Sequence, residues 1–216
     1  MPNMRQLITC ILSLCLWGTA VAATGFSSAS SGGGETTNFK AEEIITFAKK
    51  VERTLASKGA HVAILARMGR PLSEMPRGMH FTHVAFVVYS QIQTADGRTL
   101  PGYAIHNLYQ YDDKPNTSRL VIDYPVDFFS GVAHMEAGIL IPSAELQQRL
   151  IKVIASPAYA AVHEPRYSVI ANPFSEGRQN CTEFVLDVIN SAIYQTSNVK
   201  QLKQMAQNSL WSNPLK

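Results

Sequence analysis

The stretch THVAFVVY, residues 82–89, constrains the fold most strongly. Apolar side chains occupy both sets of alternating positions, which is typical of a strand that is covered on both faces. A turn signal, Asp96-Gly97, separates it from a second strand-like run, YAIHNLY, residues 103–109. The two runs predict an antiparallel hairpin at the middle of a sheet.

Each strand of this hairpin carries a histidine. If Asp96-Gly97 forms a two-residue turn, Val87 pairs with His106, and His83 lies on the same side of its strand as Val87. We therefore expect His83 and His106 to project from one face of the sheet. An imidazole in an apolar strand is costly without a partner, so each is either a hydrogen-bonded core residue or part of a polar site.

The rest of the sequence places helices on both sides of a block of strands. The predicted elements are a helix at 39–58, strands at 60–66, 82–89, 103–109, 119–124 and 136–141, and helices at 142–155, 180–194 and 198–210. Asn38 is the expected cap of the first helix. This order predicts an α+β domain in which an antiparallel sheet packs against helices.

The N-terminal segment has the features of an export signal. Arg5 gives it a positive charge, residues 7–17 are apolar, and residues 20–22 read Ala-Val-Ala, a cleavage motif. The apolar run is too short to span a bilayer. We expect a signal peptide at 1–22, a flexible Ser/Gly-rich leader at 23–37 and one domain at 38–216. The mature protein is then periplasmic or secreted and has no transmembrane anchor.

Charge and composition narrow the classes of partner. The formal net charge is +3, and the basic residues are scattered along the chain. A nucleic-acid partner is therefore not expected. Neither C-x-x-C nor H-x-x-x-H spacing occurs, so we expect no metal and no cofactor.

Cysteine usage singles out one position. The chain has three cysteines, and Cys10 and Cys15 lie in the predicted signal, which leaves Cys181 alone. A lone cysteine in an oxidising compartment is a buried inert side chain, an intermolecular link or a reactive thiol. Asn180 is a good helix cap, so Cys181 should occupy the first turn. Free N–H groups and the helix dipole would favour a thiolate there.

Three motifs in order resemble a known fold. THVAFVVY, YAIHNLY and NCTEFVLDVI are similar to the circularly permuted papain-like fold of NlpC-like and lecithin retinol acyltransferase-like proteins, in which the histidine strand precedes the cysteine helix. Over the mature length the chain is most similar to the bacterial family known as domain of unknown function 2145. The resemblance covers roughly residues 41–193, and its most specific piece is QNCTEFV.

The resemblance implies a role for each candidate residue. Cys181 would be the nucleophile and His83 the general base. His106 would orient His83, with Asn107 as the alternative because papain-like enzymes commonly use an amide there. The backbone N–H of Cys181 would face the oxyanion, and Tyr167 is a candidate for a second donor.

The expected function is thiol-dependent acyl chemistry outside the cytoplasm. The protein would be an amidase, peptidase, or acyl hydrolase or transferase that acts on an envelope peptide, amide or lipid through an acyl-enzyme on Cys181. The main alternative is a catalytically silent papain-like binding protein of the envelope. A redox role for Cys181 is less favoured, because the mature chain would contain no resolving cysteine.

Overall fold

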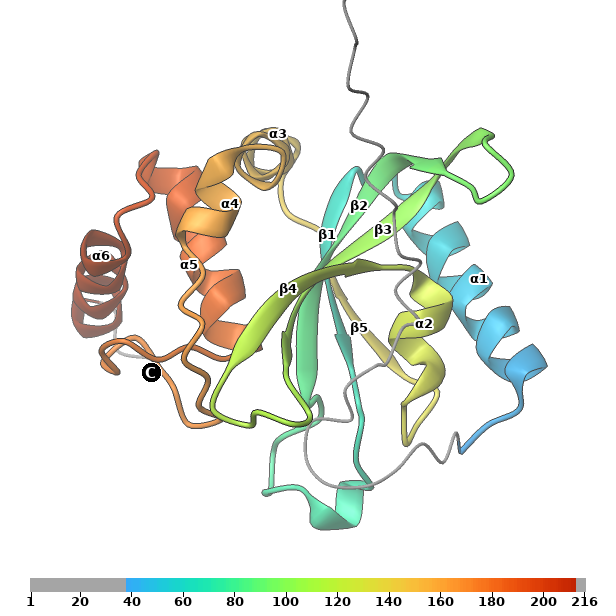
Figure 1. Cartoon of the computed structure of the whole chain (residues 1–216), viewed down its shortest axis with the longest axis horizontal. Helices are drawn as coiled ribbons and strands as arrows, with labels where there is room; N and C mark the ends of the chain where they lie inside the picture. Colours follow the sequence, from blue (N-terminus) through green and yellow to red (C-terminus); the bar gives the residue numbers. More distant parts are fainter. Residues whose placement is uncertain (1–37, 213–216) are drawn as a thin grey trace, which may run out of the picture.

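The computed structural model describes residues 38–212 (Figure 1). The predicted signal peptide and leader lie outside the described residues. The strands are β1 (Val62–Arg67), β2 (His83–Gln93), β3 (Thr99–Gln110), β4 (Ser118–Asp123) and β5 (Ala137–Leu140). They form an antiparallel sheet in the order β4-β3-β2-β1-β5. The predicted central strand, β2, is therefore in the middle.

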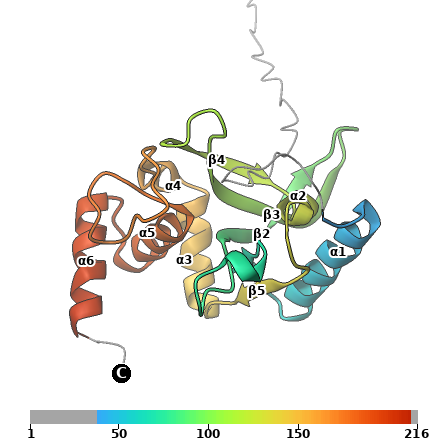
Figure 2. The same ribbon diagram turned by 90° about the horizontal axis from the view of Figure 1, so that it is seen from below.

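Helices cover both faces of this sheet. They are α1 (Ala41–Ser57), α2 (Pro125–Ser130), α3 (Ala144–Ile154), α4 (Pro157–Ala161), α5 (Cys181–Tyr194) and α6 (Val199–Ser212), with a short 3₁₀ helix η1 (Leu72–Glu74). Figures 1 and 2 show α1 and α2 on one side of the sheet and α3 to α6 on the other. The α+β prediction is confirmed. No helix within residues 38–212 is long and apolar enough to cross a membrane.

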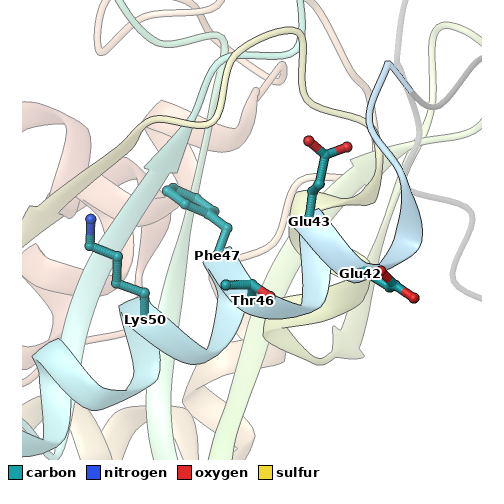
Figure 3. A pocket seen from close by; sticks show the side chains of 5 residues that line it. All are labelled: Glu42, Glu43, Thr46, Phe47 and Lys50. Atoms are coloured by element: carbon teal, nitrogen blue, oxygen red, sulfur yellow. The ribbon is translucent and has the colours of Figure 1, made fainter.

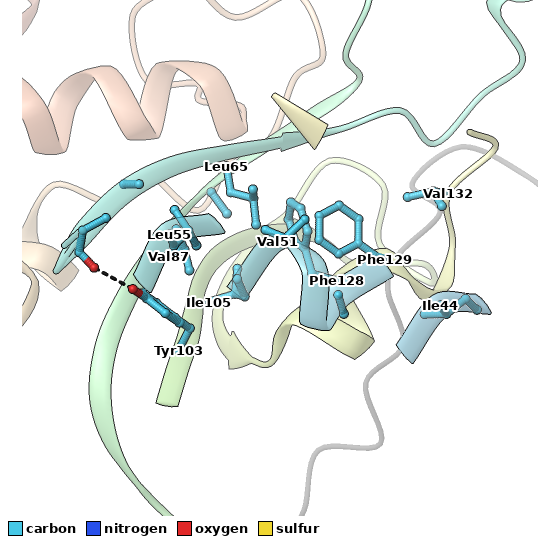
Figure 4. Packing of buried hydrophobic residues seen from close by; sticks show 14 residues of the cluster. Ile44, Val51, Leu55, Leu65, Val87, Tyr103, Ile105, Phe128, Phe129 and Val132 are labelled. Carbon is cyan, nitrogen blue, oxygen red and sulfur yellow. Dashed lines mark hydrogen bonds between the residues drawn. The ribbon is translucent and has the colours of Figure 1, made fainter. Parts of the chain in front are cut away.

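The core is divided between the two faces of the sheet. On the first face, side chains of β2 such as Ala85 and Val87 pack with α1 and α2 (Figure 4). On the second face, Phe86 and Val88 pack with α3, α4, α5 and α6. Each fully buried phenylalanine or leucine contributes roughly 1.5–3 kcal/mol relative to an exposed one. The alternation along β2 thus decides which helices each of its side chains meets.

Helix α1 begins slightly later than predicted. The backbone N–H of Lys40 donates to the Glu43 carboxylate at 2.8 Å, so Lys40 is the cap residue. The expected cap, Asn38, instead donates its amide to the carbonyl of Val132 at 3.0 Å. Asn38 therefore ties the start of α1 to the segment that follows α2.

The β2–β3 hairpin differs in register from the prediction. Phe86, not Val87, is opposite His106. The backbone N–H of Thr94 donates to the Arg98 carbonyl at 2.8 Å, so Ala95 joins Asp96 and Gly97 in the loop. Gly97 has φ of 82°, as a three-residue hairpin loop requires. The extra loop residue shifts the register by one.

This shift moves His106 to the other face of the sheet. Side chains alternate along a strand, so a one-residue slip reverses the face of each residue relative to its partner strand. His106 is directly opposite Phe86, on the α5 side, whereas His83 shares the α1/α2 side with Ala85. The prediction that the two histidines share a face is wrong. Asn107 takes the position on the His83 side.

Candidate active site

Cys181 is the first residue of α5, as predicted. The side chain of Asn180 caps the helix, with its Oδ1 accepting from the Glu183 N–H at 2.9 Å. Its Nδ2 donates to the carbonyls of Val169 and Ala171 at 3.1 and 2.8 Å. Cys181 is a free thiol and is 7% exposed. Asn180 therefore fixes both the start of the helix and the loop that leads to the thiol.

Burial dominates the ionisation of this thiol. It raises the pKa of Cys181, and the backbone N–H of Val84, the Thr182 side chain and the first amides of α5 offset part of this rise. The helix start lowers the pKa of Cys181, as expected, but desolvation raises it by more. The expectation of a resting thiolate is therefore not supported, and at neutral pH the group is a thiol.

The Val84 N–H brings the sulfur of Cys181 to the beginning of β2. Val84 directly follows His83 in the strand and faces the α5 side. Pairing of β2 with β1 continues to His83, whereas pairing with β3 stops at Phe86. The thiol of Cys181 therefore lies at the strand end that carries His83, but it contacts Val84, whose side chain points to the opposite face of the sheet from the imidazole. Among the described residues, no hydrogen bond joins the two groups.

His83 is held by a polar and an aromatic contact. Its Nε2 lies 3.0 Å from Oδ1 of Asn107, and its ring stacks on Tyr109 with centroids 5.0 Å apart. Burial, together with the charge of Arg67, lowers the pKa of His83 to about 3, while the bond to Asn107 raises it. The imidazole is consequently neutral at physiological pH, as a general base must be.

Asn107 continues into a buried network. It is fully buried, and its Nδ2 donates to Oδ1 of Asp123 at 2.7 Å. The hydroxyl of Tyr109 donates to the other carboxylate oxygen of Asp123 at 2.8 Å. Burial raises the pKa of Asp123 to about 7, and the two hydrogen bonds and Arg67 oppose that rise. The chain of contacts therefore runs from His83 through Asn107 to Asp123.

Arg67 adds a buried positive charge beside this network. It is 2% exposed, donates to the carbonyl of Phe128, and lies over the rings of Phe128 and Tyr109 at 5.0 and 6.0 Å. Its Nε is buried without a hydrogen-bond partner in the described chain. Sequence reasoning missed Arg67 and Asp123. The available signal was a charged residue at the end of each of two strand-like runs.

His106 is separate from the His83 network. Its ring makes an edge contact with Tyr159 at 5.8 Å on the α5 side of the sheet, and burial lowers its pKa. The structure therefore brings Asn107 to His83 and does not bring His106 there. Of the two residues considered for orienting His83, the geometry favours Asn107.

Tyr167 lies close enough to Cys181 for their charges to interact. Burial and the neighbouring Cys181 raise the pKa of Tyr167 to about 12, so its hydroxyl stays protonated. No group among the described residues hydrogen-bonds to this hydroxyl. Tyr167 therefore has an O–H available to donate near the sulfur.

Comparison with known sequences gives one family. A profile described as an uncharacterized protein conserved in bacteria, DUF2145, matches residues 54–213. The chain belongs to the DUF2145 family. The matched range contains Cys181, His83, Asn107 and Asp123, and the predicted resemblance to this family is confirmed. No curated protein and no solved structure matches the chain.

In this DUF2145 protein, exposed apolar side chains border the start of α5. Val169, Ile170 and Phe174 are 71%, 80% and 52% exposed, all in the loop that precedes Cys181. Side chains of α6 hold this loop, since Lys203 Nζ donates to the carbonyl of Ser175 at 2.8 Å. The loop is thus fixed while its apolar tips face solvent.

Two hollows of the DUF2145 protein lie away from Cys181 and His83. A depression of about 440 Å³ is lined by Glu42, Glu43, Thr46, Phe47 and Lys50 of α1 (Figure 3). A smaller one of about 220 Å³ lies between α1 and α2. Neither contains a cysteine or histidine. Within residues 38–212, no three His, Cys, Asp or Glu side chains gather as metal ligands.

Proposed function

We propose that the protein is a permuted papain-like cysteine enzyme that cleaves or transfers an acyl group through an acyl-enzyme on Cys181. One observation carries the proposal: Cys181 at the start of α5 contacts the backbone of β2 directly after His83, whose Nε2 is bonded to Asn107. A nucleophile, a base and an orienting amide are thus supplied at one strand end.

The reaction begins with two neutral groups. Nδ1 of His83 takes the thiol proton as the sulfur attacks the substrate carbonyl, so no thiolate has to exist beforehand. The Cys181 N–H and the Tyr167 hydroxyl donate to the oxyanion. The leaving amine or alcohol then takes the proton from His83, and water or another acceptor releases the acyl group. The substrate is a peptide, amide or lipid of the cell envelope, in keeping with the export signal predicted at residues 1–22.

Trapping the acyl-enzyme tests this function. The full-length protein and the variants Cys181→Ser, His83→Gln and His61→Gln are incubated with envelope extract, and the Cys181 peptide is examined by mass spectrometry. We expect an acyl adduct in the parent and in His61→Gln, no adduct in Cys181→Ser, and a strongly reduced amount in His83→Gln. His61 is a suitable control because its ring faces Tyr89, away from the network.

Two results would reject the proposed mechanism. One is an unmodified Cys181 in the parent, and the other is equal labelling of the parent and His83→Gln. An unmodified Cys181 favours the catalytically silent binding protein, whereas equal labelling rejects His83 as the base. Burial of the thiol and the missing hydrogen bond between Cys181 and His83 favour that second function. It predicts that Cys181→Ser retains envelope components as well as the parent does.

A further inference from the structure

We propose that Asp123 is a positioning residue that decides, through Asn107, which nitrogen of His83 carries the proton. This inference deepens the proposed function and rests on it for the catalytic consequence. The geometric part is independent of catalysis. It follows from the hydrogen-bonding capacity of three side chains in a row.

The carboxylate of Asp123 determines the first of the two hydrogen bonds. An ionised carboxylate can only accept hydrogen bonds, so Asp123 requires the NH₂ group of Asn107 at the 2.7 Å contact. The amide oxygen of Asn107 is then directed to His83. Because an amide oxygen also only accepts, the 3.0 Å contact requires a proton on Nε2 of His83. Nδ1 is left with the free electron pair that a base needs.

The groups around Asp123 favour its ionised form and thereby keep the Asn107 NH₂ group directed to Asp123. The second carboxylate oxygen accepts from Tyr109, and Arg67 supplies a positive charge from β1. Asp127 of α2 is the opposing negative charge, and the titratable His83 lies beyond Asn107 on β2. Asn107 itself is fully buried, so water does not offer its amide an alternative partner. Orientation of the amide therefore depends on the acceptor-only character of Asp123.

If the group at position 123 could also donate a hydrogen bond, the orientation of the Asn107 amide would no longer be fixed. An amide or a protonated acid at position 123 can donate as well as accept. Asn107 could then turn its oxygen towards position 123 and its NH₂ towards His83. In that arrangement Nε2 of His83 must accept, the proton moves to Nδ1, and the base is no longer available to the thiol.

Nitrogen NMR of the histidine rings tests this inference. The full-length protein is labelled with ¹⁵N-histidine, and His83→Gln identifies the His83 signals. In the parent at pH 9 we expect a single form with the proton on Nε2. In Asp123→Asn, which keeps the size of the side chain, we expect the Nδ1–H form to appear. The control Asp127→Asn removes a nearby negative charge without touching Asn107 and should match the parent.

Two outcomes would overturn the inference: an Nδ1–H form in the parent at pH 9, or an unchanged Nε2–H form in Asp123→Asn. If Asp123→Asn does not fold, the parent itself provides the measurement. Lowering the pH from 9 to 5 protonates Asp123 while His83 stays neutral, so the Nδ1–H form should appear; its absence contradicts us. The signals need no substrate. An inactive parent with the Nε2–H form would therefore reject the proposed enzyme and leave this inference standing.

Discussion

At the residue scale, the candidate site consists of neutral groups held by buried polar contacts. Cys181 is a thiol because desolvation outweighs the helix start, and His83 is a neutral imidazole because it is buried near Arg67. A site of this kind transfers the proton during attack. It differs from a resting ion pair, in which each charge stabilises the other.

The thiol should therefore titrate at higher pH in the folded protein than in the unfolded chain. We expect the iodoacetamide reaction of native Cys181 to have its midpoint above about 8.5, the usual value for a free cysteine. The same protein in concentrated urea serves as the control and should return to that usual value. A native midpoint at or below the unfolded one would mean that the thiolate is stabilised after all.

The two residues considered for orienting His83 can be separated by substitution. Asn107→Ala removes the contact with Nε2 and should lower kcat/KM by roughly 10- to 100-fold, a part of what a positioned base contributes. His106→Gln, on the other face of the sheet, should leave kcat/KM nearly unchanged. Steady-state rates on a common ester, with circular dichroism as the check on folding, make the comparison. Greater loss in His106→Gln than in Asn107→Ala would reverse the assignment.

Local sequence predicted part of this site. Asn180 and Cys181 form a motif within a few residues, so the cap and the first turn could be recognised directly. The partner of His83 depended on the register of the hairpin, which a single additional loop residue, Ala95, reversed. The charge of Asp123 near the end of a strand-like run was visible in the sequence, but its contact with Asn107 was not, because that contact depends on which strand lies next to β3.

At the element scale, a buried ion pair connects α5 to α6. Lys203 of α6 bonds to the Glu183 carboxylate in the first turns of α5, and burial raises the pKa of Glu183 to about 7 despite this partner. The same ammonium group bonds to Ser175 in the loop before Cys181. Helix α6 therefore holds both α5 and the loop that precedes it, and Figure 2 shows α5 between α6 and the sheet.

Removing one partner of this pair should be costly. Lys203→Met leaves Glu183 buried without its counter-charge and should lower the free energy of unfolding by about 3–5 kcal/mol. The double variant Glu183→Gln/Lys203→Met buries no charge and should recover part of the loss. Urea unfolding of the three proteins measures both effects. If the double variant were less stable than Lys203→Met, the explanation by an uncompensated charge would fail.

The elements themselves were predicted with uneven success. Long periodic segments gave α1, α3, α5 and α6, and short apolar runs gave the five strands. Helices α2 and α4 were missed because each is too short to show a helical period. Their prolines, Pro125 and Pro157, occupy the first helical position and in retrospect were the available signal.

At the scale of the whole molecule, buried acids and a buried histidine make stability depend on pH in opposite directions. Burial raises the pKa of Asp123 to about 7 and that of Asp187 to about 6. Each contributes stability that is complete below about pH 4 and is lost as the pH rises through these values. His83, with its lowered pKa of about 3, contributes stability that is present above about pH 6.5 and is lost as the pH falls.

Asp187 offers a clean test of these signs. Asp187→Asn can still accept from Gln179 but never ionises. Relative to the parent, this variant should be more stable at pH 8 than at pH 4 by on the order of 2 kcal/mol, given a shift of about two pKa units. Unfolding in urea at the two pH values measures the difference. If the free energies of unfolding of parent and variant differed by the same amount at pH 4 and at pH 8, Asp187 would not titrate as its burial implies.

The α+β class and the central position of β2 followed from sequence, because hydrophobic periodicity reports burial directly. The distribution of helices between the two faces did not follow, since it depends on long-range packing such as that of Phe128 and Phe129 under α1. The division matters for function, because it places His83 on one face of β2 and Val84, beside the thiol, on the other.

The acylation rate of Cys181 tests most directly whether His83 is its base. The full-length protein is mixed with p-nitrophenyl acetate at neutral pH, and acetylation of Cys181 is followed by intact mass in the parent, His83→Gln and His61→Gln. Our account predicts acetylation in the parent and in His61→Gln at the same rate, and a rate lower by about 10²- to 10⁴-fold in His83→Gln. Equal rates in the parent and His83→Gln would contradict it, because the thiol would then react without help from His83.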